Sequence, residues 1–136
     1  MASIRKEILL EVEPELVWDV IRDVGAVHER FARGFVVDTK LEGDARVVTF
    51  ANGFVAREQI VEVDGAARRL VYSASGGRLS HHNASFQVFT NGAHGTRLVW
   101  IADLLPNDAA GAIEGMMDQG MEAIKKTIVP ATAPVA

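Results

Sequence analysis

Between Phe35 and Leu104 the sequence alternates between apolar and polar residues, and short turn signals interrupt the alternation at steady intervals. A period of two is typical of strands that bury one face. The interruptions are the pairs Gly43-Asp44, Asn52-Gly53, Asp64-Gly65, Gly76-Gly77 and Asn91-Gly92. Each is long enough for a hairpin and too short for a parallel crossover. The segment therefore predicts a meander of about six antiparallel strands.

One strand and three helical segments flank the meander. Residues 4–12 alternate as a strand. Pro14 suits the first turn of a helix that Gly25 ends, and a short second helix is predicted over 26–32. Pro106-Asn107-Asp108 predicts the start of a helix over 108–128, which is about 30 Å long. This order indicates an α+β fold, a curved antiparallel sheet of about seven strands around a long C-terminal helix.

Length and composition exclude several classes of protein. With 136 residues, we expect a single domain over 1–129, followed by a disordered tail over 130–136 that holds two prolines. Cysteine is absent, which excludes disulfides and thiolate chemistry. The net charge of −4 argues against a nucleic-acid partner. No apolar run approaches the ~20 residues of a membrane span, and the N-terminus lacks the pattern of a signal peptide, so we expect a cytoplasmic protein without stable membrane insertion.

The segments that carry a family resemblance extend along most of the chain. They are Arg46-Val-Val-Thr-Phe-Ala-Asn-Gly53, Arg57-Glu-Gln-Ile60, Asp64 to Tyr72, Gly95-Thr-Arg-Leu-Val-Trp-Ile-Ala-Asp103 and Pro106. Together they resemble the SRPBCC or START-like superfamily, and within it the polyketide cyclase/dehydrase and lipid-transport group. The resemblance implies a helix-grip fold with a cavity between the sheet and the C-terminal helix, and a lipid, sterol-like or polyketide-like ligand. It also implies a second possibility, a cyclase or dehydratase.

Alternation predicts which side chains face that cavity. The face that carries Tyr72, Phe86 and Trp100 is the concave one, because large aromatic side chains need burial most. Methionines on the inward arc of the last helix suit a wall that adapts to ligand shape, although they are equally typical of ordinary core. The predicted ligand-binding residues are Trp18, Glu58, Tyr72, His82, Phe86, Trp100, Ile113, Met116, Met117 and Gly120.

Three of these residues are also the candidates for catalysis. Glu58 lies on a mostly apolar face, where it either acts as a general acid or base or is paired with an arginine or a backbone donor. Removing its charge by Glu58→Gln is expected to alter binding or turnover and to raise stability. The Tyr72 hydroxyl either contacts a ligand oxygen or packs against a neighbour. His82 is a candidate acid or base, or a ligand contact at the cavity rim.

Neither a metal nor a cofactor is expected. His81 and His82 are adjacent on one strand and point to opposite faces, so they cannot easily chelate one ion. The sequence contains no phosphate-binding loop and no nucleophile-elbow motif. On the convex face, Leu9, Val99 and Ile101 are apolar, and a homodimer contact through them is left open.

Overall fold

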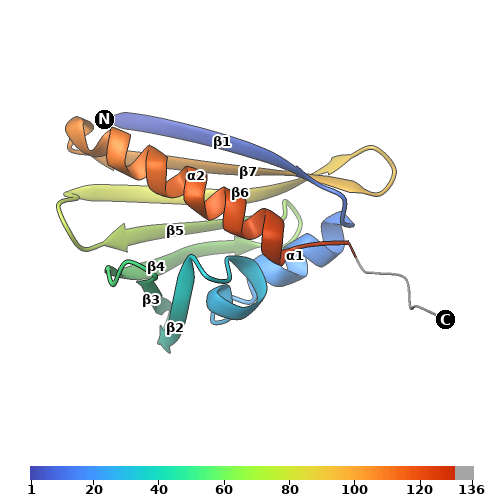
Figure 1. Ribbon diagram of the computed structural model, residues 1–136, viewed down its shortest axis with the longest axis horizontal. Helices are drawn as coiled ribbons and strands as arrows, with labels where there is room; N and C mark the ends of the chain where they lie inside the picture. Colours follow the sequence, from blue (N-terminus) through green and yellow to red (C-terminus); the bar gives the residue numbers. More distant parts are fainter. Residues whose placement is uncertain (131–136) are drawn as a thin grey trace.

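The computed structural model describes residues 1–130, and seven antiparallel strands form one sheet in the order β1-β7-β6-β5-β4-β3-β2. The sheet is a meander from β2 to β7, and β1 closes it beside β7 (Figure 1). All five predicted turns connect neighbouring strands. The strands are β1 (Ala2–Leu10), β2 (Val36–Glu42), β3 (Ala45–Phe50), β4 (Val55–Asp64), β5 (Arg69–Ser75), β6 (His81–Asn91) and β7 (Gly95–Leu105).

The first strand is shifted by two residues from its predicted position over 4–12. Its pairing with β7 begins at Ala2 opposite Leu104 and ends at Leu10 opposite Thr96. Because β7 begins at Gly95, residues beyond Leu10 have no partner strand. The alternation of side chains continues past the last ladder pair, so periodicity alone placed the end too late.

The helices agree with the predicted order but are shorter. Helix α1 (Pro14–Arg22) ends before Gly25, because the amide of Asp23 bonds back to the carbonyl of Val20. The predicted helix over 26–32 is the single π-helical turn η1 (Val27–Phe31). The C-terminal helix begins with a 3₁₀ turn, η2 (Asn107–Ala109), and continues as α2 (Ala110–Thr127). The segment Pro106-Asn107-Asp108 does mark the start of this helix, but no side chain caps it.

Helix α2 crosses the concave face of the sheet, whereas α1 lies at the end of the sheet that holds the β4–β5 turn and η1 packs beside β2 (Figure 1). The core lies between the sheet and these helices. Helix and sheet approach each other closely at Gly120, where a Cβ atom would lie 2.9 Å from the Trp100 ring. A side chain at this position would collide with the sheet, so glycine allows the helix to approach it.

The convex face offers less apolar surface than the sequence suggests. Leu9 is exposed, but Val99 is only 4% exposed. Arg97 lies directly opposite Leu9, forms an ion pair with Glu7 and stacks its guanidinium over the Phe89 ring. Charged side chains therefore separate the apolar residues of the predicted contact, and the homodimer stays a prediction.

Two further expectations concern the C-terminal tail and membrane-spanning helices. The predicted disordered tail over 130–136 lies, apart from Pro130, outside the described residues. Within residues 1–130, none of the helices has both the length and the apolar character needed to span a membrane.

Candidate functional site

A cavity of about 400 Å³ lies between the concave face of the sheet and helix α2. It opens between two hairpin loops, residues 51–54 and 76–80, and the start of α2. Most of the lining residues in these segments are exposed to solvent. Phe54 lies at this opening, and its ring packs so closely on Gly77 that a Cβ there would lie 3.0 Å from it. Gly77 also has φ of +62°, a conformation that favours glycine. The exposed side chains Arg78 and Asp108 flank the same opening.

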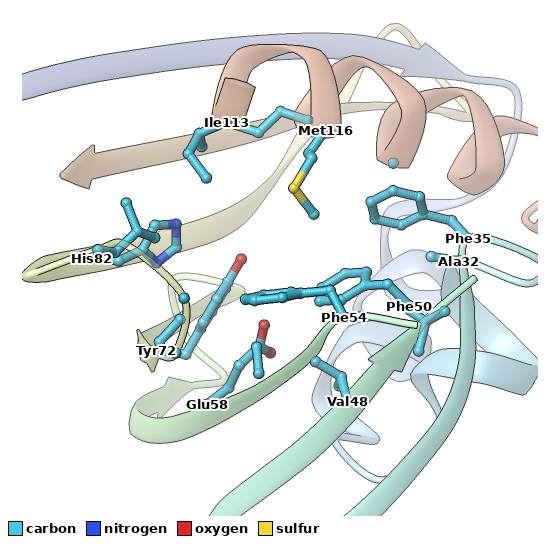
Figure 2. Close-up of a pocket in the computed structure, with 18 of the residues that line it drawn as sticks. Ala32, Phe35, Val48, Phe50, Phe54, Glu58, Tyr72, His82, Ile113 and Met116 are labelled. Carbon is cyan, nitrogen blue, oxygen red and sulfur yellow. The ribbon is translucent and has the colours of Figure 1, made fainter. Parts of the chain in front are cut away.

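Most of the cavity wall is apolar. Helix α2 contributes only apolar residues along its length, among them Ile113, Met116 and Met117. Beside Gly120 of the helix, Phe35 makes an edge-to-face contact with Phe50, with the ring centroids 5.2 Å apart. Figure 2 shows these two phenylalanines across the cavity from His82 and Tyr72. Such a wall favours an apolar ligand.

Four polar side chains of the inner wall come from neighbouring strands of the sheet, whereas Asn52, Arg78 and Asp108 lie in the exposed segments at the opening. We call the group of four the polar strip; it consists of Arg46 on β3, Glu58 on β4, Tyr72 on β5 and His82 on β6. Side chains on adjacent strands and the same face lie about 5 Å apart, so the meander brings together residues that are distant in the sequence. Their placement on one face confirms the alternation predicted for β4, β5 and β6.

Arg46 and Glu58 form a buried ion pair. The Nε of Arg46 donates to Oε1 of Glu58 at 2.7 Å, and the two side chains are 4% and 11% exposed. The residues lie directly opposite each other across the β3–β4 hairpin. Arg46 also donates to the carbonyl of Val24 at 3.4 Å, which ties the sheet to the segment after α1. Of the two roles considered for Glu58, pairing with an arginine is therefore the one observed.

Tyr72 lies with its hydroxyl directed into the cavity (Figure 2). The Nε1 of Trp100 donates to the hydroxyl oxygen at 3.0 Å, the one hydrogen bond that this hydroxyl makes within residues 1–130. Its own hydrogen is thus available to an acceptor in the cavity. Burial and, to a smaller degree, the charge of Glu58 raise the pKa of Tyr72 far above its ordinary range. The hydroxyl is therefore a neutral hydrogen-bond donor.

His82 lies beside Tyr72, with 6.2 Å between the ring centroids. Its Nδ1 atom is buried and has no hydrogen-bond partner within the described residues. Burial lowers the pKa of His82, and the nearby carboxylate of Glu58 opposes this only partly. The imidazole is therefore neutral at pH 7, with one ring nitrogen unsatisfied in the protein alone.

Nine of the ten residues predicted to bind a ligand line the cavity: Glu58, Tyr72, His82, Phe86, Trp100, Ile113, Met116, Met117 and Gly120. Their binding of a ligand stays a prediction. Trp18 is the exception and corrects our assignment. It is 6% exposed in the core, near Gly65 in the β4–β5 turn, because α1 packs at that end of the sheet.

Sequence reasoning missed Arg46, although a signal for it exists. A hairpin that turns around Asn52-Gly53 places position 46 opposite position 58, so a basic residue faces the buried glutamate. The sequence carries no comparable signal for Phe54, whose contact with Gly77 depends on how two loops meet. No group of three metal-ligating side chains occurs among the described residues.

Comparisons with known proteins agree with this architecture. Residues 1–129 match the family described as polyketide cyclase / dehydrase and lipid transport. No curated protein matches the chain.

Three of the similar solved structures have TM-scores between 0.66 and 0.82. XoxI from Bacillus cereus is 18% identical, with 93% of this chain and 94% of that chain covered and a TM-score of 0.82. A START superfamily protein from Mycobacterium smegmatis is 12% identical, with 91% and 97% covered and a TM-score of 0.69. The Zhui aromatase/cyclase from a Streptomyces species is 18% identical, with 93% and 90% covered and a TM-score of 0.66. With a family match over nearly its whole length, the chain belongs to the polyketide cyclase/dehydrase and lipid-transport family, and the solved structures share its helix-grip fold.

Proposed function

We propose that this protein binds a small, mainly apolar molecule in the cavity between the sheet and α2. The observation that carries the proposal is a cavity of about 400 Å³ whose apolar wall is interrupted only by a few polar side chains, most of them in the polar strip. This volume lies in the range of small-molecule sites, in which a few polar groups orient an otherwise apolar ligand. The family description, which includes lipid transport, supports the same reading. The cytoplasmic location is part of this proposal.

Ligand binding is favoured over catalysis because the two charged side chains of the polar strip, Arg46 and Glu58, are already paired with each other. Glu58 is held by Arg46 at 2.7 Å, so its carboxylate is a poor general base. Arg46 in turn depends on Glu58 to neutralise its buried charge. The ion pair therefore fixes the shape and polarity of the sheet wall.

Fluorescence of a single tryptophan tests this proposal. The chain has two tryptophans, and only Trp100 lines the cavity. In the Trp18→Phe variant, titration with the neutral, apolar fluorophore 1-aminoanthracene should quench Trp100 with one molecule bound per chain. Adding Ala74→Phe, which places a large ring in the cavity, should weaken binding at least about tenfold. Equal affinity with and without the Ala74 substitution would show that the probe binds elsewhere and would refute the proposal.

The second candidate is a cyclase of the aldol type, favoured by the unpartnered Nδ1 of His82 beside the Tyr72 hydroxyl. In this reading the Tyr72 hydroxyl donates to a carbonyl oxygen, and neutral His82 takes a proton from the adjacent carbon. The resulting enolate attacks a second carbonyl of the same molecule, and the new alkoxide recovers the proton from the imidazolium. The similarity to an aromatase/cyclase supports this candidate through the fold alone.

A kinetic comparison separates the two candidates. A linear tetraketone should cyclise faster with the protein than without it, and His82→Gln should remove the acceleration while 1-aminoanthracene still binds. Equal rates with the protein and with buffer would refute the cyclase and leave the binding function intact.

A further inference from the structure

Two polar side chains of the sheet wall, Tyr72 and His82, lie beside each other, and each has one hydrogen-bonding function unused. The Tyr72 hydroxyl has its oxygen occupied by Trp100 but its hydrogen unused, and the Nδ1 atom of His82 is buried without a partner. The two rings are 6.2 Å apart and tilted by 42°. Both line the cavity, and Figure 2 shows them on the same side of it. A buried polar atom without a partner costs about 1–3 kcal/mol, so the Nδ1 atom of His82 favours a ligand that satisfies it. The unused hydrogen of the Tyr72 hydroxyl offers the same ligand a donor.

One ligand oxygen can satisfy both atoms whichever ring nitrogen of His82 holds the proton. If Nδ1 is unprotonated, a ligand hydroxyl accepts from Tyr72 and donates to His82. If Nδ1 is protonated, a ligand carbonyl accepts from both residues. A hydrocarbon end would leave both atoms unpaired.

The charges around this position disfavour an ionised ligand group. Arg46 and Glu58 neutralise each other within the wall, 2.7 Å apart. If a ligand carboxylate paired with Arg46, the buried Glu58 would lose its counterion. If a ligand amine paired with Glu58, Arg46 would lose its counterion. A buried charge without a counterion is strongly destabilising, so both kinds of ligand bind poorly. The remaining charged side chains of the lining, Arg78 and Asp108, are exposed at the opening and have opposite signs. Burial lowers the pKa of His82, so the imidazole supplies no positive charge at pH 7.

We infer that the ligand presents one uncharged oxygen, a hydroxyl or a carbonyl, to Tyr72 and His82, and that ligands with an ionised group at this end are rejected. The inference rests on the proposed binding function and narrows its ligand to neutral, oxygen-bearing apolar molecules. Free fatty acids and other amphiphiles with their carboxylate at the buried position are thereby excluded.

Three naphthalene probes that differ only in the polar group test the inference. At pH 7, 2-naphthol is neutral, 2-naphthoate is ionised, and naphthalene has no polar group. We expect 2-naphthol to displace 1-aminoanthracene at concentrations about tenfold lower than either of the others, as two additional hydrogen bonds would give. Tyr72→Phe should reduce the advantage of 2-naphthol over naphthalene about fivefold. Gly115→Ala, a change on helix α2 outside the cavity lining, should leave the ranking unchanged.

Any different ranking of the three probes would overturn the inference, and each ranking would show which part of it is wrong. If 2-naphthoate binds as tightly as 2-naphthol, the strip accepts an anion. If naphthalene equals 2-naphthol, the two polar atoms do not select the ligand. If none of the three probes displaces 1-aminoanthracene, the cavity does not select this class of neutral ligand. All of these results leave the binding function standing, because that function is refuted only if Ala74→Phe does not weaken the binding of 1-aminoanthracene. The ranking in the unmodified protein decides the question even if Tyr72→Phe does not fold.

Discussion

The cavity has two walls that differ in chemistry and in how firmly they are held. The sheet wall carries the polar strip, with each residue fixed by ladder pairing and buried contacts. The helix wall is apolar, and none of the buried residues of α2 precedes Met117; they are Met117, Gly120, Met121 and Ile124. Hydrogen bonds are directional and apolar contacts are not. The sheet wall can therefore orient a ligand, whereas the helix wall can only exclude water from it.

The largest expected effect comes from breaking the ion pair of the sheet wall. Glu58→Gln leaves the charge of Arg46 buried without a counterion, and we expect a loss of about 3 kcal/mol in the free energy of unfolding. This reverses the expectation from sequence, which considered the charge of Glu58 without its partner. Urea unfolding measures the change.

The matched control for that experiment removes both charges. Replacing Arg46 and Glu58 together by methionine should recover most of the stability lost in the single variant, because no unpaired charge remains. If Glu58→Gln unfolds at the same urea concentration as the unmodified protein, the pair does not hold the wall together.

The next largest effect is expected where the two walls meet. Gly120→Ala places a Cβ 2.9 Å from Trp100 and 3.3 Å from Phe35, and we expect this overpacking to cost about 1–3 kcal/mol. Gly115→Ala has no atom within 4 Å and should gain up to about 1 kcal/mol from helix propensity. The midpoint temperature of thermal unfolding should thus fall for Gly120→Ala and rise for Gly115→Ala. A gain from both would mean that the walls are not in close contact.

A smaller effect concerns Tyr72, the only tyrosine in the chain. Burial raises its pKa in the folded state, so the unfolded chain loses the phenol proton first. The stabilising contribution of the protonated Tyr72 is therefore fully present below about pH 10, the pKa of tyrosine in the unfolded chain. Above that pH the free energy of unfolding falls by about 1.4 kcal/mol per pH unit. The ultraviolet absorbance of tyrosinate should stay absent at about pH 11 in the folded protein and appear on unfolding. Tyrosinate that forms without loss of the fold would show that the hydroxyl is solvated.

The same difference between the walls explains what the sequence could predict. Alternation assigned the inward residues of β4 to β7 correctly, because a strand leaves only two choices of face. It could not reveal that Glu58 is paired, since that depends on the register across a hairpin and on Arg46, which we had not considered. Trp18 has the apolar spacing of a cavity residue, but helical periodicity does not tell which part of the core a helix packs against.

The smallest expected effect lies within the helix wall. None of residues 110–116 is buried, and Gly111 and Gly115 weaken the backbone of this half by about 1 kcal/mol each. Ion pairs from Lys6 to Glu114 and Asp118 connect this part of the helix to β1, but they are exposed to solvent and screened by salt. We expect amide hydrogens of residues 110–116 to exchange faster than those of 120–127.

A molecule in the cavity should then tie down this half of the helix. Bound 1-aminoanthracene contacting Met116 and Ile113 is expected to slow exchange over 110–116 and to leave 120–127 unchanged. Gly115→Ala, which touches nothing in the cavity, should slow the same amides about fivefold without the probe. Equally slow exchange along all of α2, with no further protection by the probe, would make the helix a fixed wall. Ligands would then have to enter where Phe54 packs on Gly77, and Gly77→Ala, which strains that contact and its positive φ, would change the rate of binding more than any substitution in the helix.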